Sequence, residues 1–309
     1  MNTRRIAKAT VGYLWRLPVC TLAYVGGITA GGALIAALGM PLPKLPEQAN
    51  EQTTGLCLIL GSLVLTLGLA PLARRIHATF VVRWLALAGL CYVCLGVNAP
   101  LEAAIFTNMG GMATIPVIFL FPCLLFAVAL ALLFKPADRG DLFLAHAKRF
   151  FAERPAREWA WRSAAAVGAF PLIYWTFGSM IAPAVRPYYE QGQFGLALPS
   201  AAAIILVQLL RSTLFFAATL PILIAGSGPR RSLVLALGLA FYVLVGLFGM
   251  IHSYWLAPIL LVLHNVEIFA DSMVYALALV LLLVPGGAAK ADELFTRSLL
   301  CSQQATIEE

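Results

Sequence analysis

Residues 113–134 read ATIPVIFLFPCLLFAVALALLF and contain no charged side chain. A helix needs about 20 mostly apolar residues to cross the hydrocarbon core of a bilayer. The segment is long enough to do so, and a soluble domain could not readily cover so continuous an apolar surface. It therefore predicts a transmembrane helix.

The same pattern recurs along the whole chain. Apolar runs lie at 10–38, 55–73, 80–107, 113–134, 160–185, 199–226, 232–253 and 257–285. Of the 309 residues, 61% are hydrophobic and 11% are charged, whereas a soluble domain carries roughly 25% charged residues. These features predict an all-α polytopic membrane protein with about eight transmembrane helices.

The breaks between these runs are polar or rich in proline and glycine. One of them, Arg186–Glu190, is expected to separate the fifth run from the sixth. Tyrosine and tryptophan are enriched where helices meet the membrane surface. Tyr188 and Tyr189 are therefore expected to anchor the chain at the outer surface.

Basic residues predict how the helices are oriented. Eighteen of the 21 Lys and Arg residues fall on the side of the N-terminus, Lys44 and Arg186 fall on the other, and Arg211 lies within a run. Loops rich in Lys and Arg stay in the cytoplasm. Both termini are thus expected to be cytoplasmic (N-in/C-in), in a plasma membrane of the bacterial inner-membrane type. The net charge of +7 then reflects these loops, and no nucleic-acid partner is expected.

Several residues recur at a nearly constant spacing of 146 to 150 positions. The matches are Trp15-Arg16 with Trp161-Arg162, Pro71 with Pro221, and Tyr92-Val93 with Tyr242-Val243. Each half holds an even number of helices, so the halves are expected to insert in the same direction, as two parallel four-helix repeats. The predicted division is a first membrane repeat at 1–137, a cytoplasmic amphipathic connector at 138–158, a second membrane repeat at 159–287 and a cytoplasmic tail at 288–309.

A few polar residues lie inside the apolar runs. At mid-span an ionised Asp, Lys or Arg costs ~2.5–3.5 kcal/mol on insertion scales, so each such residue needs a partner or a purpose. On a helix, residues three or four positions apart share a face, which groups these residues into three sets at similar depth in the outer half of the bilayer. The predicted binding residues are Asn98 and Glu102, Gln208 and Arg211, and His264, Glu267 and Asp271.

Charge balance leaves several states of this polar pocket open. Three carboxylic acids face one arginine that cannot lose its proton. Either His264 is protonated, or a carboxylate holds a proton, or a cation binds. Arg211 is expected to lie against Glu267 or Asp271, and a buried ion pair that only fixes helix packing is the structural alternative.

No motif identifies a catalytic site, and neither a metal nor a cofactor is expected. His264-Asn-Val-Glu267 falls short of a three-ligand zinc set. The leading interpretation is a protein that binds or transports a small solute or ion, with the lipid bilayer as its surroundings. One alternative is a membrane-embedded enzyme that acts on a lipid-linked substrate, with His264 and Glu267 as acid and base. The other is a structural or assembly protein.

Overall fold

The helices of the structure coincide with the apolar runs of the sequence. The computed structural model describes residues 12–41, 46–108, 112–137 and 143–285. Within these ranges, eight helices are long and apolar enough to cross a membrane. They are Gly12–Ala37, Glu51–Ala73, Phe80–Phe106, Ile115–Leu133, Ala156–Glu190, Ala201–Ala225, Arg230–His252 and Pro258–Leu283. The prediction of an all-helical protein with eight such helices is confirmed for this part of the chain.

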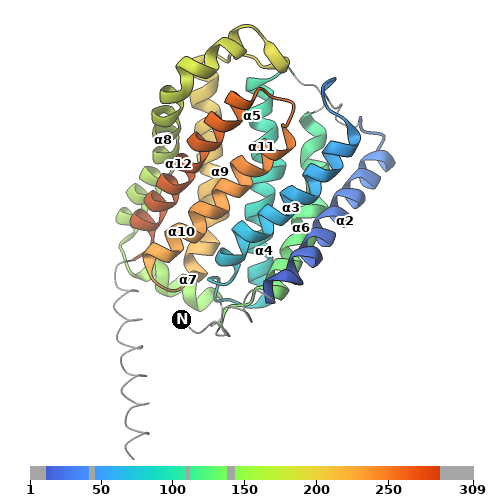
Figure 1. Ribbon diagram of the computed structural model, residues 1–309. Coiled ribbons are helices and arrows are strands. Elements are labelled where there is room, and N and C mark those ends of the chain that lie inside the picture. Colours follow the sequence, from blue (N-terminus) through green and yellow to red (C-terminus); the bar gives the residue numbers. More distant parts are fainter. Residues whose placement is uncertain (1–11, 42–45, 109–111, 138–142, 286–309) are drawn as a thin grey trace, which may run out of the picture.

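Two of the eight helices contain a π-helical segment. The third consists of α4 (Phe80–Cys91), η1 (Tyr92–Asn98) and α5 (Ala99–Phe106), and the seventh of α10 (Arg230–Phe241), η4 (Tyr242–Leu247) and α11 (Phe248–His252). The other six are α2 (Arg16–Ala37), α3 (Glu51–Ala73), α6 (Ile115–Leu133), α8 (Ala156–Glu190), α9 (Ala201–Ala225) and α12 (Pro258–Leu283). The short elements are η2 (Met112–Thr114), α7 (Phe143–Ala152) and η3 (Gln193–Gly195). Figure 1 shows α7 across one end of the bundle and the loop that contains η3 at the other. These are called the α7 end and the η3 end below.

One predicted boundary is wrong. The segment Arg186–Glu190 does not interrupt the helix, because α8 continues through it to Glu190. Arg186 and Glu190 form an ion pair of 2.7 Å one turn apart, which supports the last turn of the helix. The chain turns instead at Gly192, whose φ of 63° is readily adopted by glycine.

The outer surface of the bundle is apolar. Leu22, Leu172 and Met180 are each 71% exposed, and Leu206 is 70% exposed. In water such a surface would favour aggregation, whereas lipid tails solvate it as well as a protein interior does. The exposed leucines therefore agree with a bilayer as the surroundings of the helices.

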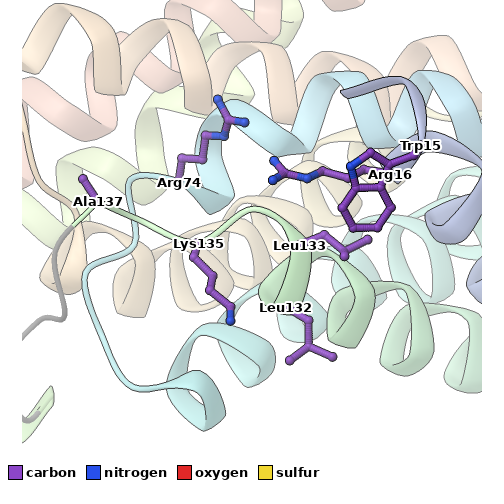
Figure 2. A pocket seen from close by; sticks show the side chains of 7 residues that line it. All are labelled: Trp15, Arg16, Arg74, Leu132, Leu133, Lys135 and Ala137. Atoms are coloured by element: carbon purple, nitrogen blue, oxygen red, sulfur yellow. The ribbon is translucent and has the colours of Figure 1, made fainter. Parts of the chain in front are cut away.

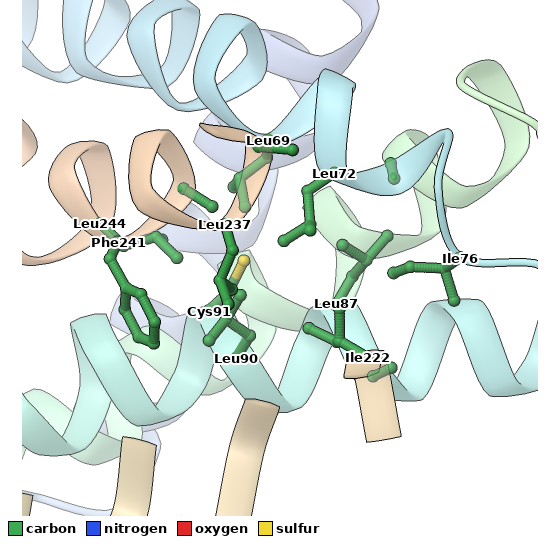
Figure 3. Close-up of a cluster of buried hydrophobic side chains, with 14 of the residues drawn as sticks. Leu69, Leu72, Ile76, Leu87, Leu90, Cys91, Ile222, Leu237, Phe241 and Leu244 are labelled. Atoms are coloured by element: carbon green, nitrogen blue, oxygen red, sulfur yellow. The ribbon is translucent and has the colours of Figure 1, made fainter. Parts of the chain in front are cut away.

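Four helices meet in the centre of the bundle. Leu69 of α3, Leu87 of α4, Ile222 of α9 and Leu237 of α10 are all fully buried and belong to one cluster. Figure 3 shows side chains from these four helices interlocking. This cluster joins elements from the first and the second half of the chain.

Close packing of α2 on α6 depends on two glycines. A β-carbon on Gly27 would overlap the backbone of Pro122, and one on Gly31 would overlap the carbonyl group of Ile118. Small residues allow helix backbones to approach closely in membranes. The contact between α2 and α6 is therefore a tight backbone contact.

Backbone hydrogen bonds join the two halves of the chain at both ends of the bundle. After α3, residues 75–77 pair with residues 225–227 through an antiparallel bridge between Ile76 and Gly226, with N–O distances of 2.8 and 3.0 Å. At the η3 end, residues 106–108 pair with residues 195–197 through a bridge between Thr107 and Leu196, with two bonds of 2.8 Å. We call these the 76/226 clasp and the 107/196 clasp.

Arginines bind the carbonyl groups at the C-terminal ends of two helices. Arg83, which is buried, donates to the carbonyl groups of Ala131 (2.6 Å) and Phe134 (3.1 Å) at the end of α6. At the end of α12, the carbonyl groups of residues 282–284 accept hydrogen bonds from Arg154, Arg162 and Arg230. Cations in this position donate hydrogen bonds to carbonyl groups that have no partner within the helix. They also interact favourably with the negative end of the helix dipole.

Candidate functional site

Arg211 is the largest fully buried side chain of the protein's described part. It lies on α9 and donates from Nη1 to Glu102 Oε1 at 2.7 Å and to Gln208 Oε1 at 2.9 Å. Its Nε donates to Oδ1 of Asn98. A guanidinium group at 1% exposure needs such acceptors because burial removes its hydration. Asn98 and Gln208, each 1% exposed, thus fix the position of the Arg211 guanidinium group by accepting its hydrogen bonds.

The predicted partner of Arg211 is wrong. Its ion pair is with Glu102 of α5, whereas Glu267 and Asp271 of α12 make no hydrogen bond with it. The π-helical segment η1 ends at Asn98, directly before α5. Because a π-segment changes the number of residues per turn, the direction of Asn98 and Glu102 could not be counted from the residues that precede it.

The three polar residues of α12 form a second group. His264 Nδ1 lies 2.9 Å from Glu267 Oε2, and His264 Nε2 lies 3.2 Å from the hydroxyl group of Tyr189. Asp271 is 4% exposed, and its Oδ1 has no hydrogen-bond partner among the described residues. The spacing of i, i+3 and i+7 places all three on one face, as the sequence indicates.

Both groups border one cavity of about 540 Å³. Glu102 and Arg211 contribute to its lining from α5 and α9, and His264, Glu267 and Asp271 contribute from α12. Five of the seven predicted residues therefore lie around a common space. Asn98 and Gln208 do not line the cavity and contact it only through Arg211.

Aromatic side chains close the inner end of the cavity. The ring of Tyr275 lies 5.1 Å from that of Phe170 and 5.7 Å from that of Phe241, and Phe215 lies 5.2 Å from Phe170. All four rings line the cavity. Leu196 and Leu256, in the loops at the η3 end, line its other end. The cavity thus extends from the η3 end to an aromatic floor in the middle of the bundle.

The sequence did not identify the wall that α8 provides. Tyr174, Gly178, Val185 and Tyr189 line the cavity, and a β-carbon on Gly178 would lie 3.0 Å from Glu267 Oε1. Their spacing is that of one helical face. This face was not recognised from the sequence because the helix was expected to end before Arg186–Glu190. Tyr189, assigned to the membrane surface, bonds to His264 instead.

The charges around the cavity do not balance. Glu102 neutralises Arg211 at 2.7 Å. Arg186 also lines the cavity, but it forms its ion pair with Glu190. Glu267 and Asp271 are therefore left without a permanent cation among the described lining residues. An intramembrane site of this kind attracts protons or cations.

Comparison of this chain with models of known protein families, with curated proteins and with solved structures gives no match. The fold itself defines a coarse class, that of a helical protein whose eight apolar helices are compatible with a multi-pass membrane protein.

Proposed function

We propose that the protein binds or transports a small solute or ion through this intramembrane cavity. The observation that carries the proposal is the 540 Å³ space in which acids of α12 face the Arg211–Glu102 pair of α9 and α5. A protein that needed its ion pair for packing alone would not need to keep a large cavity beside it. Interiors are close-packed, and cavities lower stability.

The charges favour a solute with a positively charged group. Glu267 and Asp271 are 6% and 4% exposed, and among the described lining residues they are the acids without a permanent cation. Tyr174 and Trp175 line the same space, and the faces of such rings attract cations. We expect the cationic group of the solute to bind near these acids, and we expect the apolar remainder of the solute to pack against the rings.

The surroundings of the site follow from the basic loops. With the 18-to-2 distribution of Lys and Arg, the α7 end faces the cytoplasm of a bacterial-type plasma membrane. The η3 end, and the cavity with it, then faces outward. Both termini are cytoplasmic in this arrangement.

Two parallel four-helix repeats are part of the same proposal. The π-segments η1 and η4 begin at Tyr92 and Tyr242, 150 positions apart. The bridged residues Ile76 and Gly226 are also 150 positions apart. Corresponding helices also pack alike, since α2 contacts α6 as α8 contacts α12, and α3 contacts α10 as α9 contacts α4. A two-fold axis through the 76/226 clasp and along the membrane normal accounts for all three relations.

Binding of a lipophilic cation to the purified protein tests the proposal. Tetraphenylphosphonium is expected to bind to the protein in nanodiscs and to bind more weakly to Glu267→Gln and Asp271→Asn. Glu47→Gln removes an exposed acid of the loop before α3 and is the matched control, with unchanged binding. Equal binding by all four proteins, or no binding at all, contradicts a cation-selective cavity.

Transport is distinguished from binding by flux. In proteoliposomes, uptake of the same cation driven by a pH gradient is expected for a proton-coupled transporter, and Asp271→Asn is expected to abolish it. Binding without uptake in either direction would restrict the function to binding.

One observation favours a second function, a membrane-embedded enzyme that acts on a lipid-linked substrate. Tyr189, His264 and Glu267 form a continuous hydrogen-bonded chain on the cavity wall. In such a chain the carboxylate orients the imidazole ring, which then accepts or donates a proton. A His264→Gln variant that still binds an amphiphile but no longer converts it would support this function, and unchanged conversion would exclude His264 as the acid or base.

A further inference from the structure

A second cavity lies near the α7 end, on the opposite side of the bundle from the acids. It has a volume of about 610 Å³ and is lined by Trp15, Arg16, Arg74, Leu132, Leu133, Lys135 and Ala137. Arg16 begins α2, Arg74 follows the last residue of α3, and Lys135 follows the end of α6. Three helix ends thus bring basic residues to the lining of one space; in Figure 2 the guanidinium groups of Arg16 and Arg74 lie near each other, and the Lys135 side chain points away from them.

The two guanidinium groups have no anionic partner among the described residues. Neither the side chain of Arg16 nor that of Arg74 forms an ion pair or hydrogen bond with any described residue, and Arg16 Nε is a buried atom without a partner among them. Figure 2 shows the two groups directed toward each other. Two like charges repel, so this arrangement costs free energy unless an anion lies between them.

Aromatic rings hold the two guanidinium groups in place. Arg16 lies 5.4 Å from the centre of the Phe134 ring, and Arg74 lies 5.6 Å from it and 4.6 Å from the ring of Tyr13. Stacking on a ring fixes the plane of a guanidinium group but does not use its N–H donors. The donors remain free to bind a planar or tetrahedral oxyanion.

In the other half of the chain, arginines near the α7 end do have acceptors within the protein. Arg154 and Arg162 share the carboxylate of Glu158, at 3.4 and 2.7 Å, and also donate to carbonyl groups of α12. At the end of α6 the corresponding carbonyl groups are taken by Arg83. Arg16 and Arg74 are therefore left with donors and no acceptor from the described part of the protein.

We propose that Arg16 and Arg74 bind a phosphate group. Phosphate oxygens match the paired N–H groups of arginine in geometry and charge. Leu132 and Trp15, which are 47% and 52% exposed, lie beside the cations. A phospholipid can place its phosphate between the guanidinium groups and its acyl chains on this apolar surface, whereas free phosphate uses the cations alone.

The test compares lipid compositions in nanodiscs. Phosphatidylglycerol, added to phosphatidylcholine, is expected to raise the melting temperature of the protein and to remain bound in native mass spectrometry. Arg16→Gln/Arg74→Gln is expected to weaken retention by about tenfold or more. Arg157→Gln/Arg231→Gln removes two exposed cations and changes net charge equally, so it serves as the matched control with unchanged retention.

Inorganic phosphate distinguishes the two sources of the group. Phosphate that stabilises the protein in pure phosphatidylcholine, and does so only with Arg16 and Arg74 present, supports the site with free phosphate as its ligand. Phosphatidylglycerol retention that is equal in all three proteins overturns the proposal.

Two further variants keep the test decisive. Arg16→Lys/Arg74→Lys keeps the charges, so retention should fall less than with glutamine; if the glutamine variant does not fold, this variant is compared with the wild type. Asp138 and Asp141 lie outside the described residues. Asp138→Asn/Asp141→Asn should retain phosphatidylglycerol as the wild type does. A marked gain would show that these acids neutralise the cations and would overturn the proposal.

Discussion

A double-mutant cycle on Arg211 and Glu102 tests the central contact of the acidic cavity. The N–O distance is 2.7 Å, and the side chains are 1% and 32% exposed. At an effective dielectric constant of about 20, such a distance gives a Coulomb attraction of about 6 kcal/mol as a ceiling. Because about a third of the Glu102 side chain is exposed, water reduces this value. The coupling free energy should be about 2 kcal/mol, above the 0.2–1 kcal/mol of exposed pairs and below the ~3–5 kcal/mol lost when a buried pair is broken.

The perturbation is Arg211→Met, Glu102→Gln and the two together. Each single change should be harmful, since Arg211→Met also leaves Asn98 and Gln208 without the donor they now bind. The free energy of unfolding is measured in mixed micelles of mild detergent and dodecyl sulfate, and the coupling is the departure from additivity.

A second cycle with Asp271→Asn provides the comparison. Asp271 lines the same cavity but makes no hydrogen bond with Arg211, so the coupling should be below about 1 kcal/mol. A larger coupling to Asp271 than to Glu102 would refute the arrangement described above. The double variant of Arg211 and Glu102 also shows whether this ion pair serves packing or function. A stable double variant that binds no cation indicates that the pair contributes to the binding site. A stable double variant that still binds the cation indicates that the pair only fixes the packing of the helices.

The remaining predictions concern packing, topology and symmetry. Gly27→Ala should lower the free energy of unfolding by about 1–3 kcal/mol, because its methyl group meets the backbone of Pro122. Gly26→Ala, with nothing within 4 Å, should be neutral or stabilising by up to about 1 kcal/mol, and equal losses in the same unfolding assay would disprove the close contact. Reporter fusions should be extracytoplasmic at Asn50, Gln191 and Ser253 and cytoplasmic at Arg75, Arg154 and Gln303; a cytoplasmic signal at Gln191 would overturn the proposed orientation. In an experimental structure, helices 1–4 should superpose on helices 5–8 by rotation about the membrane normal, and a best fit about an in-plane axis would refute parallel repeats.

Hydropathy was sufficient to predict the helices because the bilayer allows few alternatives for the backbone. It was not sufficient at Arg186–Glu190. The last turn of α8 contains a proline and two charges, which resemble a loop, yet the charges pair with each other within the helix. Local composition indicates where polar groups occur but not whether they satisfy one another.

The polar residues of the cavity were predictable because they are costly in a membrane. Their pairing was not predictable. Depth along the chain placed Arg211 near the acids of α12, but the rotation of each helix decides which acid it meets, and η1 alters that rotation for Glu102. Tyr189 was missed for a related reason, since its role depends on α8 extending past Pro187.

The basic residues show how one count can combine different roles. Arg83 was counted with the residues that set orientation, and the structure places it against the carbonyl groups of Ala131 and Phe134. Positive-inside counting records only the side of the membrane. It does not separate a cation that caps a helix from one that is free to bind a ligand, such as Arg16.

The two clasps have a mechanical consequence. Each joins the halves of the chain by two main-chain hydrogen bonds, and a typical bond contributes about 0.5–1.5 kcal/mol net. A clasp therefore holds with about 1–3 kcal/mol, which corresponds to an open fraction of roughly 1–15% if nothing else opposes it. If the protein transports a solute as proposed, contacts of this strength would allow one end of the bundle to open while the clasp at the other end stays closed. The contacts are between main-chain groups, so the 76/226 clasp forms between residues as different in size as Ile76 and Gly226.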